Sequence, residues 1–123
     1  MMLKDDFYSI VAIECNETKI HATIKIEADH VIFAGHFPGN PVTPGVVEME
    51  LVKELVSECL KKKIKLTKMS NCKFLAILNP LHSSLVRINI DIIENYEDRI
   101  RISGQILDDH TVFMKISAEY INV

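Results

Sequence analysis

The 123-residue sequence contains no tryptophan and only four glycines, four prolines and three cysteines. Cys15, Cys59 and Cys72 are odd in number and far apart, which fits neither a disulfide framework nor a Cys-x-x-Cys metal clip. We therefore expect three buried, reduced thiols. No two of the five histidines have the i, i+4 spacing that places two ligands on one helix face. The pattern predicts no metal site.

Long hydrophobic runs are also absent. The longest, such as residues 74–78, have about five residues, whereas a helix that crosses a bilayer needs about 20. The sequence begins Met-Met-Leu-Lys-Asp-Asp, with two acids where a signal peptide would begin its apolar stretch. These features predict a protein that does not span a membrane and stays in the cytoplasm. The length suits one domain, residues 1–123.

The net charge of −3, without a basic-aromatic motif, excludes a typical nucleic-acid-binding protein. The charges are unevenly spread: residues 59–90 hold seven bases and no acid, and the rest of the chain holds seven bases and 17 acids. One interpretation is that the lysines complement the carboxyl end of a helix and keep a sheet edge soluble. The other is a docking patch for an acidic macromolecule, centred on Lys61, Lys62 and Lys65.

Apolar and polar residues alternate strictly through residues 19–27, which indicates a half-buried strand. Residues 7–14 predict a strand that forms a hairpin with it through a turn at 16–18. A helix is then predicted with Thr43 as its N-cap, Pro44 at its first position and the triple lysine at its end. Four further strands are predicted at 71–78, 84–93, 99–107 and 111–121. The order β-β-α-β-β-β-β indicates an α+β fold in which a mainly antiparallel sheet wraps one central helix.

The segment from Gly35 to Gly45 contains three glycines and three prolines, so it must be a shaped loop rather than helix or strand. It contains His36 and leads into the predicted helix. A histidine beside a helix N-terminus, whose free N–H groups point outward, places a neutral base next to an anion-binding site. That pairing suits removal of a proton next to a carbonyl. The alternative is a structural turn with a packed histidine.

The stretch His-Phe-Pro-Gly-Asn-Pro-Val-Thr-Pro-Gly-Val begins at His36 and is followed by Glu50, 14 residues after the histidine. It resembles the active-site motif of the FabZ-type 3-hydroxyacyl-acyl carrier protein dehydratases. Residues 29–35 resemble the segment that leads into that histidine, and residues 71–80 resemble the strand after the central helix. The resemblance implies the hot-dog fold and a homodimer, often three such dimers together. His36 of one chain would face Glu50 of the other.

The resemblance also implies a role for each residue of the motif. His36 would remove the C2 proton of a 3-hydroxyacyl thioester, and Glu50 would protonate the departing C3 hydroxyl. Gly45 would donate its N–H to the thioester oxygen, and Val42 would orient the His36 ring through its carbonyl. The enzyme would be a hydro-lyase of fatty acid or related lipid synthesis that forms the trans-2-enoyl thioester. Its substrate would be carried on the phosphopantetheine of acyl carrier protein, with no cofactor or metal.

Three features depart from the family pattern. Glu54 stands where glutamine is common, Glu48 stands where an apolar residue is usual, and the segment before the first strand is short. Like charges on one helix face raise each other's pKa where they are poorly solvated. Glu54 therefore either helps to keep Glu50 protonated or lies on a solvated helix edge.

Other functions stay open on the sequence. One is a dehydratase for an aryl polyene or polyketide-like lipid, which shares the chemistry and differs in the shape of the acyl tunnel. Another is a non-catalytic hot-dog subunit that binds acyl carrier chains, which the acids around Glu50 favour. A thioesterase is less favoured, because hot-dog thioesterases generally lack the His-Phe-Pro-Gly loop.

Overall fold

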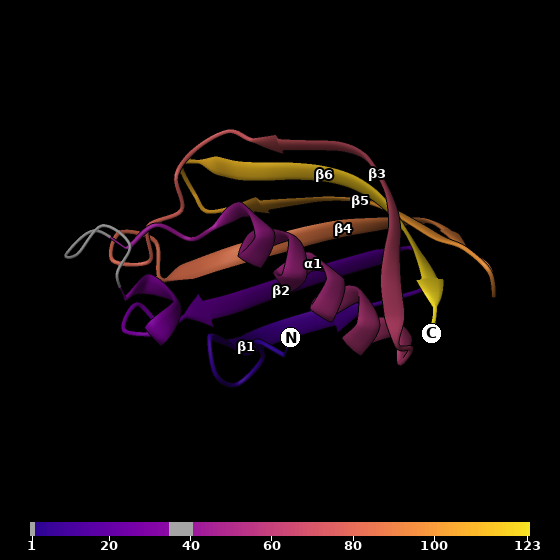
Figure 1. Cartoon of the computed structure of the whole chain (residues 1–123), viewed down its shortest axis with the longest axis horizontal. Helices are drawn as coiled ribbons and strands as arrows, with labels where there is room; N and C mark the ends of the chain where they lie inside the picture. Colours follow the sequence, from indigo (N-terminus) through magenta and orange to yellow (C-terminus); the bar gives the residue numbers. More distant parts are fainter. Residues whose placement is uncertain (1, 35–40) are drawn as a thin grey trace.

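The computed structural model describes residues 2–34 and 41–123, in which a long helix lies across one face of a curved sheet (Figure 1). The elements follow the order β1 (Tyr8–Cys15), β2 (Lys19–Ile26), η1 (Val31–Phe33), α1 (Gly45–Leu60), β3 (Ile64–Phe74), β4 (Leu85–Asn95), β5 (Ile100–Leu107) and β6 (Val112–Asn122). Every neighbouring pair is antiparallel, in the spatial order β1-β2-β4-β5-β6-β3. The predicted α+β class and element order are confirmed.

The β1–β2 hairpin follows from its turn residues. Asn16 Oδ1 accepts the N–H groups of Thr18 and Lys19 at 2.9 and 2.8 Å, a side-chain turn that reverses the chain without help from the rest of the fold. The predicted hairpin is therefore confirmed. The alternation that predicted β2 also predicts which of its side chains face the core. These side chains are buried in the structure: Ile20, Ala22, Ile24 and Ile26.

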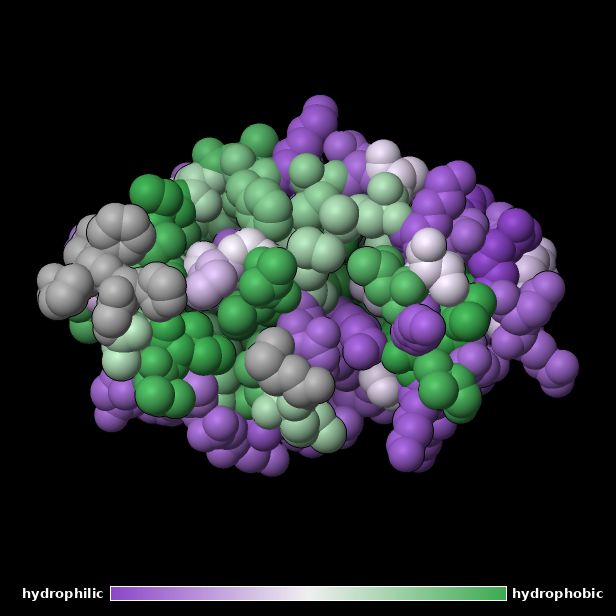
Figure 2. Space-filling model, in the orientation of Figure 1, coloured by the Kyte–Doolittle hydropathy of each residue, from purple (hydrophilic) through white to green (hydrophobic). Residues whose placement is uncertain are grey.

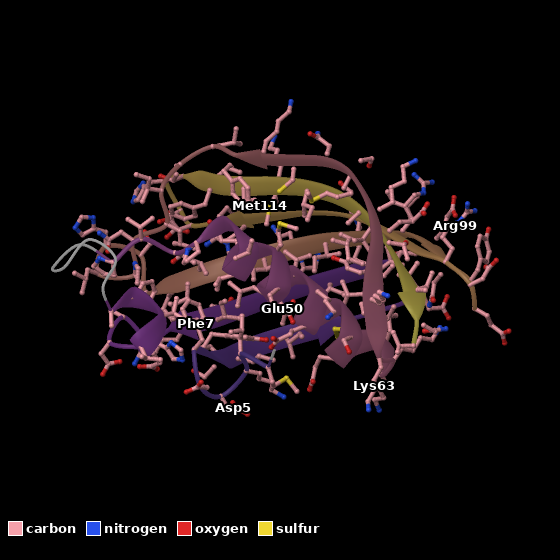
Figure 3. The ribbon with its side chains drawn as sticks, viewed as in Figure 1. Asp5, Phe7, Glu50, Lys63, Arg99 and Met114 are labelled. Atoms are coloured by element: carbon pink, nitrogen blue, oxygen red, sulfur yellow. A yellow bond between two sulfur atoms is a disulfide. The ribbon has the colours of Figure 1, made fainter. Side chains whose placement is uncertain are left out.

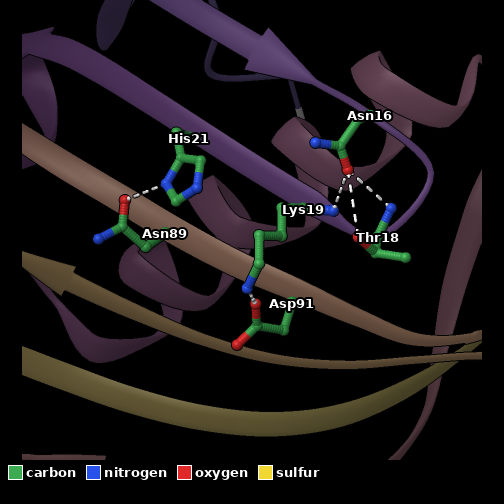
Figure 4. Close-up of polar contacts among 6 residues, drawn as sticks. All are labelled: Asn16, Thr18, Lys19, His21, Asn89 and Asp91. Carbon is green, nitrogen blue, oxygen red and sulfur yellow. Dashed lines mark hydrogen bonds and ion pairs between the residues drawn. The ribbon is translucent and has the colours of Figure 1, made fainter.

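Polar side chains pair across the outer face of the sheet (Figure 4). The Nζ of Lys19 lies 2.7 Å from Oδ1 of Asp91, and Nδ1 of His21 lies 3.0 Å from Oδ1 of Asn89, which holds β2 in register with β4. These pairs are exposed, so each adds only a few tenths of a kcal/mol to about 1 kcal/mol. The register is fixed mainly by the buried residues on the opposite face of both strands.

The core lies between α1 and the inner face of the sheet. The helix turns one apolar stripe toward the strands, made of Val47, Leu51, Val52, Leu55 and Val56. Burial of each such side chain stabilises the fold by roughly 1.5–3 kcal/mol. The inner faces of β4, β5 and β6 meet this stripe with Ile88, Ile90, Ile102, Ile106, Met114 and Ile116. The position of α1 on the sheet therefore follows from apolar burial.

Two predicted boundaries are wrong. The strand predicted at 71–78 is β3 at Ile64–Phe74, which begins seven residues earlier and ends before the apolar run at 75–78. Most of β3 is exposed because it is the last strand of the sheet, so it lacks the buried alternation that predicted the other strands. Pro44, not Thr43, is the N-cap of α1, and no side chain caps this end. Thr43 is instead buried, and its N–H donates to the carbonyl of Leu78 at 3.0 Å.

The prediction of three reduced thiols is wrong for two of them. Cys15 at the end of β1 forms a disulfide with Cys59 in the last turn of α1, across 44 residues of sequence and a Cα–Cα distance of 5.9 Å. Cys72 is free and half-buried. Because disulfides persist mainly in oxidising compartments, this bond gives no support to the cytoplasmic location, which stays a prediction.

Reduction of the Cys15–Cys59 disulfide should lower the free energy of unfolding and leave the fold unchanged. Closing a 44-residue loop restricts the unfolded chain and is expected to be worth about 2–4 kcal/mol. Cys15→Ser, Cys59→Ser and the reduced wild type should therefore show the same lowered urea midpoint. Cys72→Ser is the matched control, because Cys72 is free and half-buried. It should change the urea midpoint much less than the loss of the disulfide does. Equal midpoints with and without reductant would contradict the bond.

Candidate active site

The N-terminus of α1 carries backbone N–H groups that the helix itself does not use. The carbonyl of Pro44 accepts the N–H groups of Val47 at 3.0 Å and Glu48 at 3.1 Å. The N–H groups of Gly45 and Val46, the first two helical residues, have no partner within a helix. The Val46 side chain is 70% exposed, so this end of the helix dipole faces solvent. Free N–H groups and a positive dipole end suit an anion or a developing oxyanion.

Gly45 lets the end of β3 approach this turn. A methyl group in place of its hydrogen would lie 2.7 Å from Cζ of Phe74, closer than real Cβ atoms come to a neighbour. The Phe74 ring is half exposed and covers the first turn from the side of the sheet edge. The glycine predicted to bind the thioester oxygen is thus also the residue against which the Phe74 ring packs.

Glu50 lies near the middle of α1, on the side away from the sheet (Figure 3). Its side chain is only 17% exposed, and Nζ of Lys53 lies 3.8 Å from its Oε1. Burial raises the pKa of Glu50, the Lys53 ammonium opposes that rise, and the carboxylate of Glu54 adds to it. A raised pKa makes this carboxyl better suited to donate a proton near neutral pH.

Glu54 fixes the N-terminal segment to the helix. Its Oε2 accepts the N–H of Leu3 at 2.8 Å, and its Oε1 accepts the N–H of Lys4 at 3.0 Å and the hydroxyl of Tyr8 at 3.2 Å. The interpretation of Glu54 as a solvated helix edge is therefore wrong. The residue both raises the pKa of Glu50 and holds the chain that precedes β1.

Glu54→Gln should separate these two effects. An amide replaces one acceptor oxygen by a donor and loses the charge, so we expect a loss of about 1.5–3 kcal/mol in the free energy of unfolding. Removing the like charge should also lower the pKa of Glu50 and move the alkaline limb of any rate profile to lower pH. Glu58→Gln is the control: among the described residues Glu58 pairs with Lys4 alone, at the surface, so its loss should cost under about 1 kcal/mol. Equal stability of the two variants would contradict the assigned role.

Glu48, which stands where the family pattern has an apolar residue, is buried in the first turn of α1. Its side chain is 3% exposed, in the first turn of α1 and on the face that packs against the sheet. Its Oε1 has no hydrogen-bond partner among the described residues. Burial raises its pKa to about 8. The sequence indicates this burial, because Glu48, Val52 and Leu55 have the i, i+4, i+7 spacing of one helix face.

Of the four residues assigned to the reaction, the structure describes three. Val42 and Gly45 lie at the N-terminal end of α1, and Glu50 lies between one and two turns further along the same helix. His36 lies outside the described residues, and its role remains a prediction. Val42 is half-buried, and its proposed hydrogen bond to the histidine is likewise untested.

The lysines predicted to dock a partner lie at the opposite end of α1. Lys61 takes a left-handed conformation that ends the helix, which spans 16 residues and hence about 24 Å from Gly45. Lys62 reaches Asn95 Oδ1 at 3.2 Å, and Lys65 is exposed on β3. Figure 2 shows hydrophilic side chains mostly at this end and hydrophobic ones mostly at the other. The second group includes the exposed side chains of Val31, Val46, Phe74, Leu75 and Ile77.

Within residues 2–34 and 41–123, the structure holds no group of three side chains that could ligate a metal ion. In the same ranges, none of the helices has the length and apolar character to cross a membrane.

Comparison with known proteins places these features in a family. The model of a family described as ApeI-like, ApeI dehydratase, matches residues 12–113. A 3-hydroxyacyl-[acyl-carrier-protein] dehydratase FabZ from Wolbachia pipientis wMel is 30% identical over 86 residues, covering 63% of this chain and 60% of the relative. A FabZ from Wolbachia sp. subsp. Drosophila simulans is 26% identical over 114 residues, covering 86% of this chain and 80% of the relative. The chain thus spans less than two thirds of the wMel relative.

Solved structures share the fold at low sequence identity. The dehydratase heterocomplex ApeI:P from Xenorhabdus doucetiae contains a chain with a TM-score of 0.75 and 17% identity, covering 92% of this chain and 96% of that chain. A putative thioesterase, yhdA from Lactococcus lactis, has a TM-score of 0.67 and 11% identity, covering 96% of this chain and 93% of that chain. These likenesses confirm the predicted hot-dog fold. At such identities they carry no information about the reaction.

Proposed function

Because the chain belongs to the ApeI-like dehydratase family, we propose that it converts a 3-hydroxyacyl thioester to the trans-2-enoyl thioester and water. The observation that carries the proposal is the arrangement on α1. The helix begins at Gly45 with N–H groups that it does not use itself, and it also carries Glu50, a carboxyl whose pKa is raised by burial. In a homodimer, the N-terminus of α1 of one chain would act together with Glu50 of the other. Dehydration needs these two elements, a site for negative charge on the thioester oxygen and an acid for the hydroxyl.

The reaction divides into two proton transfers. His36 takes the proton from C2, and the electron pair moves into the thioester carbonyl, whose oxygen becomes an enolate held by the N–H of Gly45 and the helix dipole. The electrons then return to form the C2–C3 double bond as the C3–O bond breaks. Glu50 of the other chain of the dimer gives its proton to the leaving oxygen, which departs as water. A single backbone donor to the oxyanion is typically worth about 3–4 kcal/mol of the barrier.

We propose a homodimer formed through the free edge of β3. The sheet ends at β3, whose outer side leaves backbone groups and the half-exposed side chains of Met69 and Phe74 unpaired. An unprotected edge strand is a template for pairing, and a two-fold axis pairs two copies of the same edge antiparallel. Such pairing would bring the beginning of one β3 beside the end of the other.

That arrangement resolves the separation between the lysines and the reaction site. Lys65 near the beginning of β3 is far from Gly45 of its own chain but would lie near Phe74 and Gly45 of a two-fold partner. We propose that Lys61, Lys62 and Lys65 dock the acyl carrier protein, which would deliver its phosphopantetheine arm to the neighbouring subunit's site. Charge pairing of this kind mainly accelerates the encounter and weakens with added salt.

Substitution at the two sheet edges tests the dimer. Met69→Lys places like charges near each other across the proposed two-fold axis and should convert the dimer to monomers in light scattering. Val11→Lys is the matched control, because Val11 is an exposed apolar residue on β1 at the opposite edge of the sheet. A dimer that survives Met69→Lys and dissociates with Val11→Lys would place the interface on β1 instead.

Turnover of carrier-bound substrates tests the reaction. The wild type should form enoyl thioester from at least one 3-hydroxyacyl carrier protein of short, medium or long chain, read by mass spectrometry. His36→Ala should lose a factor of about 10² to 10⁴ in rate without unfolding. A His36→Ala protein with more than about a tenth of wild-type activity would remove the base from the mechanism.

A second candidate is a non-catalytic subunit of a mixed complex. The related Xenorhabdus structure is a heterocomplex, and this chain has two carboxyls, Glu48 and Glu54, at positions where the FabZ-type pattern has neutral residues. Binding of acyl carrier protein without any turnover, alone or with other hot-dog chains, would favour this candidate. A dehydratase for an aryl polyene or polyketide-like lipid shares the mechanism proposed above and differs only in the acyl chain accepted.

A further inference from the structure

Glu48 is a buried carboxyl in a place where burial is costly. It is 3% exposed and its Oε1 has no hydrogen-bond partner among the described residues. An unpaired polar group in an apolar layer destabilises the fold, and a leucine or methionine of similar volume would fill the same space without that cost. A group that lowers stability in this way calls for an explanation in function.

The helix directs this carboxyl toward the open N-terminus of α1. Side chains on a helix lean toward its N-terminus and cover the preceding turn. Glu48 comes three residues after Gly45, so both lie on the same side of the first turn. The end of β3 forms the opposite wall, where the Phe74 ring contacts Gly45 and the Cys72 thiol lies close enough to feel the charge of Glu48.

The surroundings keep this carboxyl uncharged. Burial raises the pKa of Glu48 to about 8, so the group is mostly protonated at pH 7. Cys72 is the titratable group that faces it from β3, and burial followed by the charge of Glu48 raises the pKa of that thiol. The inward residues of β2, which also contacts α1, are all apolar. Glu50 and Glu54 lie on other faces of the helix.

We propose that Glu48 acts as a neutral carboxylic acid that donates a second hydrogen bond to the thioester oxygen held by the N–H of Gly45. This inference rests on the proposed dehydration and adds a catalytic residue to it. An acid kept neutral by an apolar site can stabilise an enolate oxygen without repelling it. The proton stays on Glu48 throughout, while the proton on the leaving water still comes from Glu50. Glu48 and Glu50 thus have separate tasks, set by the two faces of α1 on which they lie.

The charge state is tested first, without any substrate. The folded pKa of Glu48 is raised above its unfolded value near 4.5, so its contribution to stability is complete below that pH and is lost as the pH rises through about 8. The melting temperature of the wild type should fall over this window, and Glu48→Gln should remove part of that fall. Glu48→Leu should melt at a temperature equal to or higher than the wild type. An unchanged pH dependence in Glu48→Gln would show a solvated carboxylate and overturn the proposal.

Activity is tested on the same pair of variants with a 3-hydroxyacyl pantetheine thioester. Glu48→Leu should lose about 10²- to 10³-fold in kcat with a smaller change in KM, because the lost hydrogen bond is strongest to the enolate. Glu48→Gln, which keeps an N–H donor, should retain about a tenth of the wild-type kcat or more. Its plot of kcat against pH should lack the fall near pH 8 that deprotonation of Glu48 causes in the wild type. A Glu48→Leu enzyme that is stable and fully active would overturn the proposal and leave the proposed dehydration intact.

Infrared difference spectroscopy tests the hydrogen bond from Glu48 to the thioester oxygen without any turnover. The band of a protonated carboxyl that is present in wild type and missing in Glu48→Gln should shift when butanoyl pantetheine thioester, which has no hydroxyl to lose, is added. A shift in a protein that never forms enoyl product would retain Glu48 as a ligand of the thioester oxygen while the dehydration fails. A bound thioester that leaves the band unmoved would overturn the role of Glu48, whatever the activity.

Discussion

The contact between the first turn of α1 and the end of β3 is the constraint on which the rest of the site depends. Gly45 allows the Phe74 ring to lie against the helix backbone, where any larger residue would collide with it. The apolar stripe of α1 holds the remainder of the helix on the sheet. Because Phe74 packs against Gly45, the first turn of α1 and its unused N–H groups lie beside the end of the edge strand β3.

Three carboxyls on one helix differ because each meets a different neighbour. Glu48 faces the apolar layer beneath the helix, Glu50 lies mostly covered beside Lys53, and Glu54 is hydrogen-bonded to the chain ahead of β1. Their pKa values differ accordingly: burial alone raises that of Glu48, while opposing charges limit the rise at Glu50. One helix thus carries two carboxyls with raised pKa values and a third that holds the N-terminal segment.

Sequence patterns predicted the parts of the fold whose causes are local. Alternation placed β2, β4, β5 and β6 within a few residues of their observed bounds, and Asn16 marked the hairpin turn. The beginning of β3 was missed because an edge strand exposed along most of its length has no buried alternation. The Cys15–Cys59 disulfide and the bonds from Glu54 to Leu3 and Lys4 join residues 44 to 51 apart in sequence, and only the folded sheet brings them together. The role of His36 still rests on the motif alone.

The most direct test of the account is the fate of the hydrogen on C2. When the wild type is incubated in deuterium oxide with a trans-2-enoyl pantetheine thioester, the reverse reaction should give a 3-hydroxyacyl thioester with one deuterium on C2, seen by mass spectrometry. That product requires the base, the oxyanion site and the acid on the same bound substrate. Release of free acid in place of the hydroxyacyl thioester would identify a thioesterase, and recovery of unchanged enoyl thioester from a protein that binds it would contradict catalysis.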